Sequence, residues 1–254
     1  MSTIYPDSHF HLLSLKEKEI TLSSDYPLSG IDIGTECDDY DLRYPLFSLF
    51  KEVHFSLGCG PWSTERELSI DEQLKILEAN IVAHRPIALG EIGLDYHWNY
   101  STPENQQTLF IKQLELANKY KLPVIIHVRE ADEDIIRILT TYPVKKKGIF
   151  HCFSSSAKLA AFAVEQGYFV SFSGNITYKN SKGLQEIAKT IPSSQLLAET
   201  DSPYLAPVPM RGRINTPENV KYVYEFLANL RGVDKEELRK AIVSNLNRFY
   251  TLSL

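Results

Sequence analysis

The sequence predicts an α/β protein folded as a (β/α)8 TIM barrel, and three observations lead to this prediction. The chain has 254 residues, which is a typical length for such a barrel. Short apolar runs rich in β-branched residues recur at fairly even spacing, with segments of helical period between them. No linker, low-complexity tract or change of composition divides the chain, so we expect residues 1–254 to form a single domain. A doubly wound open sheet has the same local signature and stays open as an alternative.

The apolar runs give the order of the strands. The expected strands cover residues 3–8, 30–34, 53–58, 86–92, 123–128, 148–152, 168–172 and 196–200. The first crossover is the weak point, because residues 12–29 have no convincing apolar stripe and their helix should be short or absent. Residues 35–52 are also brief for a full crossover. We therefore expect the barrel to be distorted near its first three strands.

Capping signals mark the start of the later helices. Residues 69–72 read Ser-x-x-Glu, a capping box in which each side chain can bond the other residue's backbone N–H. Residues 102–103 and 216–217 are both Thr-Pro, which places a capping hydroxyl before a proline at the first helical position. Asp-x-x-Glu at residues 234–237 opens the last helix, and apolar side chains follow each signal at helical spacing.

The composition is that of an ordinary soluble globular protein. Lys and Arg number 27 against 32 Asp and Glu, so the net charge of −5 exerts no global attraction on nucleic acid. Cys37, Cys59 and Cys152 form no CxxC pair, which favours a reducing compartment. No apolar run approaches the roughly 20 residues that cross a bilayer, and the N-terminal segment carries no leader-like apolar core. We expect a cytoplasmic protein without a membrane or an obligate protein partner.

Two histidines stand at the end of the first strand. Alternate strand residues project to the same side, so His9 and His11 can reach one metal ion while Phe10 points away. An isolated HxH is a weak signal, and a solvated strand end explains it equally well. Asp7 has the same parity, and a carboxylate beside ligating histidines is the usual partner that fixes their tautomers.

Other strand ends carry compatible ligands. Glu91, His127, His151 and Asp201 end or follow the fourth, fifth, sixth and eighth expected strands. In a barrel the carboxyl ends of all strands converge on one mouth, so residues far apart in the chain can meet there. Unpaired charged and imidazole groups at such positions would be costly, and a shared metal ion would offset that cost. The sequence therefore predicts a metal centre at the C-terminal mouth, whereas His54, His84 and His97 lie elsewhere.

Six ordered blocks resemble one known family. DSHFHL, GEIGLDYH, IHVRE, FHCF, ETDSPYL and RGRINTPENV are similar to the signature blocks of the TatD-type metal-dependent deoxyribonucleases of the amidohydrolase superfamily. The resemblance runs from Asp7 to about Leu246 and implies a (β/α)8 barrel with two divalent metal ions. It implies that one ion is held by His9, His11 and Asp201, that the other is held by His127 and His151, and that Glu91 bridges both.

The resemblance also implies the chemistry. The ions are expected to be Zn, Mn or Mg; imidazole ligands favour transition metals, and availability decides in cells. A glutamate offsets the repulsion between two cations, and water held between them becomes a nucleophile near neutral pH. Asp201 and Glu91 are the expected catalytic residues, with Asp201 accepting a proton. The expected reaction is cleavage of phosphodiester bonds in DNA, with exonucleolytic action as one option.

Further residues are candidates for substrate contact. Arg129 shares the parity of His127 and either touches a phosphate at the mouth or is an ordinary surface arginine. Arg211, Arg213 and Asn215 resemble the family's substrate-side loop, and forked guanidinium groups suit phosphate oxygens.

Two carboxylates are expected to support the centre from outside. Glu199 and Asp95 can bond the ligating histidines or help with proton transfer, and Asp95 can equally cap the segment that follows it.

Two departures from the family pattern leave the expected metal ligands unchanged and bear on the identity of the substrate. The family commonly has His-Pro at the rim after the third strand, where this chain has Gly60-Pro61, and it usually has glycine within the block at residues 151–156. With the pI of about 5.8, the altered rim favours an alternative: an amidohydrolase-like enzyme that cleaves a small amide, lactone or phosphoester. A non-catalytic metal or nucleic-acid binding protein is the third hypothesis, which the full ligand set disfavours.

Overall fold

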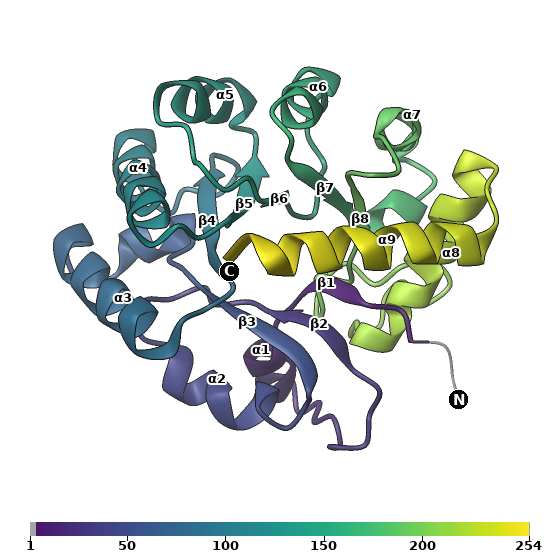
Figure 1. Cartoon of the computed structure of the whole chain (residues 1–254), viewed down its shortest axis with the longest axis horizontal. Helices are drawn as coiled ribbons and strands as arrows, with labels where there is room; N and C mark the ends of the chain where they lie inside the picture. Colours follow the sequence, from purple (N-terminus) through teal and green to yellow (C-terminus); the bar gives the residue numbers. More distant parts are fainter. Residues whose placement is uncertain (1–3, 254) are drawn as a thin grey trace.

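The computed structural model describes residues 4–253, and within them eight parallel strands lie in chain order around a barrel (Figure 1). The strands are β1 (Asp7–Phe10), β2 (Ser29–Asp32), β3 (Glu52–Leu57), β4 (Ala88–Asp95), β5 (Val124–Arg129), β6 (Ile149–Phe150), β7 (Phe169–Phe172) and β8 (Leu196–Ala198). The helices are α1 (Leu12–Glu17), α2 (Tyr40–Phe47), α3 (Ile70–His84), α4 (Pro103–Tyr120), α5 (Asp132–Thr141), α6 (Ala157–Glu165), α7 (Lys182–Thr190), α8 (Val220–Arg231) and α9 (Lys235–Tyr250). The predicted (β/α)8 barrel is confirmed, and the open doubly wound sheet is excluded because its strands would not follow chain order.

The barrel closes where β8 returns to β1. Phe10 and Ser202 form an isolated parallel bridge. The Asp201 N–H donates to the His9 carbonyl at 3.0 Å, and the His11 N–H donates to the Ser202 carbonyl at 2.9 Å. Closure therefore takes place at the carboxyl ends of the strands, among the residues that the sequence singled out.

The first strand begins later than predicted. It starts at Asp7, whose register partner is Gly30, while Thr3 lies outside the described residues. Pro6 has no N–H to donate to a neighbouring strand. Its carbonyl accepts a hydrogen bond from the Tyr224 hydroxyl at 2.8 Å.

The last helix closes the opposite end of the barrel. In Figure 1, α9 crosses in front of the strands. The Asn245 side chain donates to the carbonyl of Leu196, where β8 begins, at 2.8 Å. The ring of Tyr250 lies 4.1 Å from that of His54 near the start of β3. Because α9 covers the amino ends of the strands, the carboxyl ends form the open mouth. No helix among residues 4–253 is long and apolar enough to span a bilayer.

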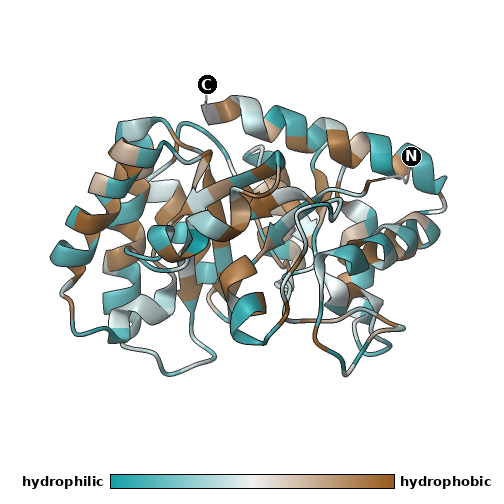
Figure 2. Ribbon diagram, turned by 90° about the horizontal axis from the view of Figure 1, so that it is seen from below, coloured by the Kyte–Doolittle hydropathy of each residue, from teal (hydrophilic) through white to brown (hydrophobic). Residues whose placement is uncertain are grey.

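The first two crossovers are short, as expected. Helix α1 has 6 residues and α2 has 8, with Pro45 inside it. Together they cover a small apolar cluster that is separate from the main core. This cluster contains Phe10, Leu12, Leu15, Leu28, Phe47 and Phe50. The other helices combine hydrophobic and hydrophilic residues (Figure 2), as amphipathic barrel helices do.

A buried arginine joins the elements of this distorted part. Arg43 is 1% exposed, and its Nε donates to Asp32 Oδ2 at 2.9 Å. Its Nη1 donates to Asp39 Oδ1 at 2.9 Å and to the Ser56 carbonyl at 3.1 Å. The second oxygen of Asp32 accepts the Leu12 N–H that starts α1, at 2.9 Å. One guanidinium group therefore links α1, α2, β2 and β3.

The capping signals were mostly correct. Ser69 forms the expected capping box, with its backbone N–H donating to the Glu72 carboxylate at 2.9 Å. Thr102 and Asp234 accept backbone N–H groups in the first turns of α4 and α9. Thr216 does not cap α8 as predicted, because a 3-10 turn (Pro217–Asn219) intervenes and α8 begins only at Val220.

Replacing Arg43 by Met should lower the free energy of unfolding by about 3–5 kcal/mol, because the buried carboxylates Asp32 and Asp39 would lose their partner. Urea denaturation followed by circular dichroism measures the change. Arg66→Met is the control: Arg66 pairs with Asp38 at 2.8 Å but is 28% exposed, so the loss should be below about 1 kcal/mol. Equal losses in the free energy of unfolding for the two variants would show that the buried Arg43 network stabilises the fold no more than an exposed ion pair does.

Candidate metal centre

The structure brings the six expected ligands together at the mouth. His9 lies in β1 and His11 just after it, Glu91 in β4 and His127 in β5, while His151 follows β6 and Asp201 follows β8. All except the fully buried His9 line a cavity of about 670 Å³. Residues separated by up to 192 positions meet there because every strand ends at this mouth.

One oxygen of Glu91 faces the first pair of histidines. Glu91 Oε2 lies 3.4 Å from His9 Nε2 and 3.8 Å from His11 Nε2. The two imidazole nitrogens are 3.2 Å apart. Asp201 Oδ1 completes the group at 3.7 Å from His9 Nε2 and 3.4 Å from His11 Nε2.

The other oxygen of Glu91 faces the second pair. Glu91 Oε1 lies 2.8 Å from His127 Nδ1 and 2.9 Å from His151 Nε2. These two nitrogens are again 3.2 Å apart. One carboxylate thus stands between two pairs of imidazoles.

This donor set fits divalent metal ions. Bonds of about 2.0–2.1 Å in a tetrahedral zinc site separate neighbouring ligand atoms by roughly 3.3 Å, and the separations in the His9 group are 3.2–3.8 Å. His9, His11 and Asp201 form one cluster of potential ligand atoms, and Glu91, His127 and His151 form another. Each cluster combines imidazole nitrogen with carboxylate oxygen, a mixture that suits zinc and manganese.

The electrostatics of the centre are dominated by Glu91. Burial raises the pKa of this carboxyl, but the imidazoles of His151, His127 and His9 outweigh burial and hold the pKa well below its ordinary value. Burial lowers the pKa of His151, but Glu91 and Glu199 raise it well above its ordinary value. Protons and metal ions compete for the same imidazole lone pairs, so metal binding here must release protons.

Two outer carboxylates contact the histidines from behind. Asp95 Oδ2 lies 3.0 Å from His127 Nε2, while its Oδ1 accepts the N–H of His97 at 3.0 Å. The two expectations for Asp95, supporting a histidine and capping the next segment, therefore both apply. This contact leaves Nδ1 of His127 to face the centre.

Glu199 lies behind histidines of both groups. Its Oε1 is 3.5 Å from His151 Nδ1, and Glu199, His151 and His9 each place a potential ligand atom within 4.8 Å of the others. The rings of His9 and His151 stack at 3.9 Å with an interplanar angle of 9°. Glu199 is thus placed to orient His151, and its carboxylate also lies near His9 of the other group.

The role expected for Asp7 was wrong. Its carboxylate accepts the hydroxyl of Thr200 at 2.5 Å and the backbone N–H of His9 at 3.2 Å rather than an imidazole N–H. A strand residue two positions before His9 shares its parity but lies one layer deeper in the barrel. Asp7 therefore joins β1 to the end of β8 beneath the centre.

Asn215 is also not the substrate contact that we expected. It is 0% exposed, and its amide donates to the carbonyls of Thr200 and Tyr204 at 2.9 and 2.7 Å. The side chain fastens the loop that follows β8, which leaves it no group for a ligand.

Of the three arginines, only Arg129 lines the cavity. Its guanidinium carbon lies 5.4 Å from the Trp98 ring centroid. Arg211 and Arg213 are exposed on the loop after β8 and are not among the cavity-lining residues. The Arg211 guanidinium lies over the Tyr178 ring at 4.4 Å.

Sequence reasoning missed the aromatic side chains of the cavity. Trp62, Trp98, Tyr100 and Tyr204 all line it. They follow the carboxyl ends of β3, β4 and β8. This position in the sequence could have indicated that they lie at the mouth. His54 and His84 pack against Tyr250 and Tyr40, away from the centre.

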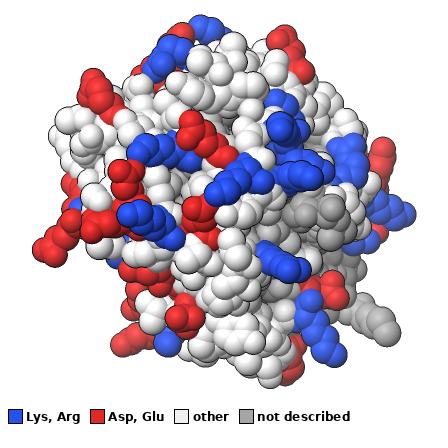
Figure 3. All heavy atoms as spheres, turned by 60° about the vertical axis from the view of Figure 1, so that its left-hand side comes forward, with Lys and Arg blue, Asp and Glu red and all other residues white. Residues whose placement is uncertain are grey.

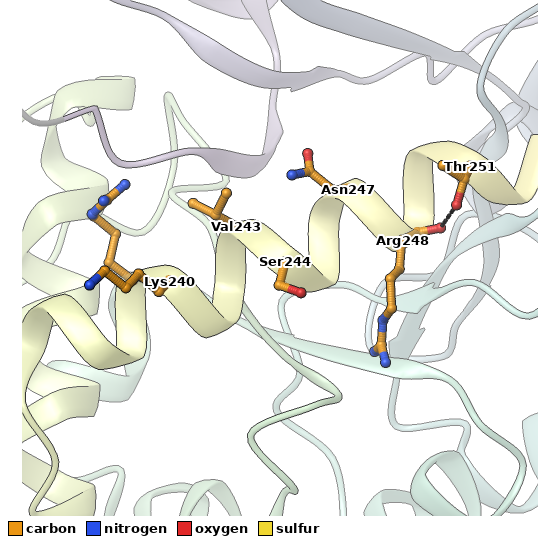
Figure 4. Close-up of a pocket in the computed structure, with 7 residues that line it drawn as sticks. Lys240, Val243, Ser244, Asn247, Arg248 and Thr251 are labelled. Atoms are coloured by element: carbon orange, nitrogen blue, oxygen red, sulfur yellow. Dashed lines mark hydrogen bonds between the residues drawn. The ribbon is translucent and has the colours of Figure 1, made fainter.

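A second hollow lies on α9, at the closed end of the barrel (Figure 4). Its lining residues include Lys240, Ser244, Asn247 and Arg248 but no carboxylate or imidazole among the described residues. It therefore has no ligand set for a cation.

Comparisons with known proteins identify the family of this chain. The family model of TatD-related DNases matches residues 6–251. The chain belongs to this family. It is 36% identical over 207 residues to the metal-dependent hydrolase YabD of Bacillus subtilis, covering 81% of each chain. It is 33% identical over 254 residues to the metal-dependent hydrolase YcfH of Escherichia coli K12, covering 96% of this chain and 94% of YcfH.

The fold has a close structural counterpart as well. The TatD homologue YJJV of Escherichia coli K12 superposes with a TM-score of 0.88 at 27% identity, covering 97% of this chain and 98% of that one. As a TatD family member, this protein is a metal-dependent hydrolase.

Replacing Glu91 by Gln should lower metal content and turnover together. The amide keeps the size of the side chain but removes the negative charge that would offset the charge of bound cations. Metal analysis after dialysis, with activity measured on the same samples, provides the test. Glu130→Gln is the control, because that carboxylate is 62% exposed and pairs with His97 outside the centre. Full activity with two ions per chain in Glu91→Gln would rule out a bridging role.

Glu199→Gln should weaken metal binding at both positions, whereas Asp95→Asn should weaken only the position that includes His127. Each loss should be about 10- to 100-fold in affinity, as for other outer partners of ligating histidines. Calorimetric titration of metal-free protein resolves the two binding steps. If Glu199→Gln affected a single step, the nearby charge of Glu199 would have no influence on metal binding at His9.

Proposed function

We propose that this protein hydrolyses phosphodiester bonds of DNA at the centre around Glu91. The observation that carries the proposal is the arrangement of two imidazole pairs on either side of one carboxylate, because two-metal sites commonly serve phosphodiester cleavage. The match to the model of TatD-related DNases over residues 6–251 supports the choice of substrate. Exonucleolytic cleavage is part of this proposal.

The two carboxylates of the centre have different tasks in this reaction. Divalent ions bound here supply Lewis acidity, which lowers the pKa of water and stabilises charge on the phosphate. Glu91 is 3% exposed and holds the two halves of the centre together. The Asp201 side chain is 13% exposed, so it is the one placed to accept the proton of the attacking water and return it to the leaving oxygen.

Local cations must attract the polyanion, because the whole chain has a net charge of −5. On the face shown in Figure 3, basic and acidic side chains are interspersed. Arg129 at the cavity, with Arg211 and Arg213 on the loop after β8, supplies positive charge on the side of the mouth. These arginines suit phosphates on either side of the scissile bond.

A small ester is the second candidate substrate, and one observation favours it. Among the described residues that line the cavity, Arg129 is the only lysine or arginine. A substrate with a single phosphate or none would need no further cation.

Activity assays on one preparation decide between the two candidates. Protein freed of metal by chelation is supplied with Zn, Mn or Mg and offered labelled single-stranded DNA, RNA of the same sequence and a panel of small esters and amides. DNA cleavage that is lost on chelation and restored by metal is the expected result. Hydrolysis of a small ester with intact DNA under all three metals would overturn the proposal.

The double variant Arg211→Ala/Arg213→Ala should weaken DNA cleavage and flatten its dependence on salt. With single-stranded DNA, the slope of log(kcat/KM) against log[salt] should fall by about 0.7 for each phosphate that an arginine no longer neutralises. Lys145→Ala/Lys146→Ala is the matched control, because these lysines precede β6 at the closed end of the barrel. An unchanged slope in the arginine variant would remove both residues from the DNA-binding surface.

A further inference from the structure

A tryptophan occupies the cavity rim at the point where Gly60 leaves room for it. Gly60 has φ −63° and ψ 166°, an extended conformation that any residue adopts. A Cβ atom at this position would lie 2.3 Å from Cζ2 and 2.4 Å from Cε2 of Trp62. Backbone geometry therefore does not require glycine here, but the indole ring does.

The Trp62 indole packs directly against one of the expected metal ligands. Its centroid is 5.7 Å from that of His127, with an interplanar angle of 85°, and His127 Nδ1 is 2.8 Å from Glu91. The centroid of the Trp62 ring also lies 6.1 Å from that of Tyr100, with an interplanar angle of 68°. The rings of Trp62, Tyr100 and His127 line the same cavity. Aromatic side chains therefore lie directly beside the centre.

Hydrogen bonds fix the short 3-10 turn that carries this indole, η1 (Pro61–Glu65). The Gly60 N–H donates to the Thr35 carbonyl at 2.9 Å. The Ser63 hydroxyl donates to Glu36 Oε2 at 2.8 Å, and the Gln73 side chain donates to the Ser63 carbonyl at 2.9 Å. Because the turn is already fixed, little backbone entropy is lost when a ligand stacks on its indole.

We infer that Trp62 is the stacking residue of a subsite that binds the nucleobase next to the scissile phosphate. The inference rests on the proposed DNA cleavage and names the contact by which the substrate is positioned. One sugar joins a base to its phosphate, so a base against Trp62 leaves that phosphate over the centre. Arg129 beside Trp98 on the same cavity provides a cation for the neighbouring phosphate. An aromatic ring next to a cation is the usual combination for single-stranded nucleic acid.

The test compares two oligodeoxynucleotides that differ only in whether the terminal residue carries a base or is abasic. Charge and scissile bond are identical, so a difference reports recognition of the base. The metal-loaded wild type should prefer the base-bearing end by about 10- to 100-fold in kcat/KM, mainly through KM, as for other base-stacking aromatics. Trp62→Ala should abolish the preference, and Trp62→Phe should retain part of it.

Gly60→Ala separates stacking from the mere presence of an indole. The added methyl group displaces the Trp62 ring, so this variant should lose preference for the base although Trp62 is unchanged. Tyr44→Ala is the control, because Tyr44 is 51% exposed on α2 and does not line the cavity. Metal content measured for every variant reveals any disturbance of His127.

Binding can be read without cleavage. The chain has 2 tryptophans, so Trp98→Phe leaves Trp62 as the only one. Its fluorescence should be quenched on titration with a base-bearing oligonucleotide whose terminal linkage is a non-hydrolysable methylphosphonate, and not with the abasic equivalent.

The outcomes distinguish the inference from the function on which it rests. Equal cleavage of both oligonucleotides by wild type, or no quenching, would overturn the Trp62 subsite and leave DNA cleavage standing. A small ester cleaved while both oligonucleotides stay intact would overturn the proposed function. Equal losses on both oligonucleotides in Trp62→Ala, together with reduced metal content, would assign Trp62 to support of His127 instead.

Discussion

Two backbone hydrogen bonds between the end of β8 and β1 are the interaction on which the centre depends. They join Asp201 to His9 and His11 to Ser202, and three of the six expected ligands therefore belong to the closure itself. In an open sheet the first and last strands would stand at opposite edges, and Glu91 would face only the pair formed by His127 and His151. Barrel closure thus creates the half of the centre formed by His9, His11 and Asp201.

Glu91 then satisfies opposing requirements at once. A buried carboxylate is costly unless it is paired and hydrogen-bonded, and four imidazoles surround this one. When protonated, those imidazoles offset the charge of Glu91. When deprotonated, the same nitrogen atoms offer the lone pairs that divalent ions need. Electrostatic compensation within the protein and affinity for metal are therefore properties of one cluster, supported from behind by Asp95 and Glu199.

The irregular first third of the barrel also has a place in this arrangement. Short α1 and α2 cannot cover the sheet with a continuous apolar face, and the buried Arg43 network links them to β2 and β3 instead. The loop after β2 bonds to the rim turn that carries Trp62 through Thr35 and Glu36. Ordering of the distorted crossovers and ordering of the cavity wall are thus connected by direct hydrogen bonds.

The sequence by itself determined the strand order, the starts of α3, α4 and α9 and the set of residues at the mouth, because these depend on local periodicity, capping chemistry and the shared polarity of parallel strands. His9 and His11 share a face by parity alone, and Glu91, His127, His151 and Asp201 each end or follow an apolar run. Only the tertiary structure decided that Asn215 is buried, that Asp7 serves Thr200 and that Arg43 lies in the interior. The same holds for the indole of Trp62 at the cavity. Those outcomes depend on contacts between segments far apart in the chain or on how a loop folds back on itself, and neither leaves a periodic trace in the sequence.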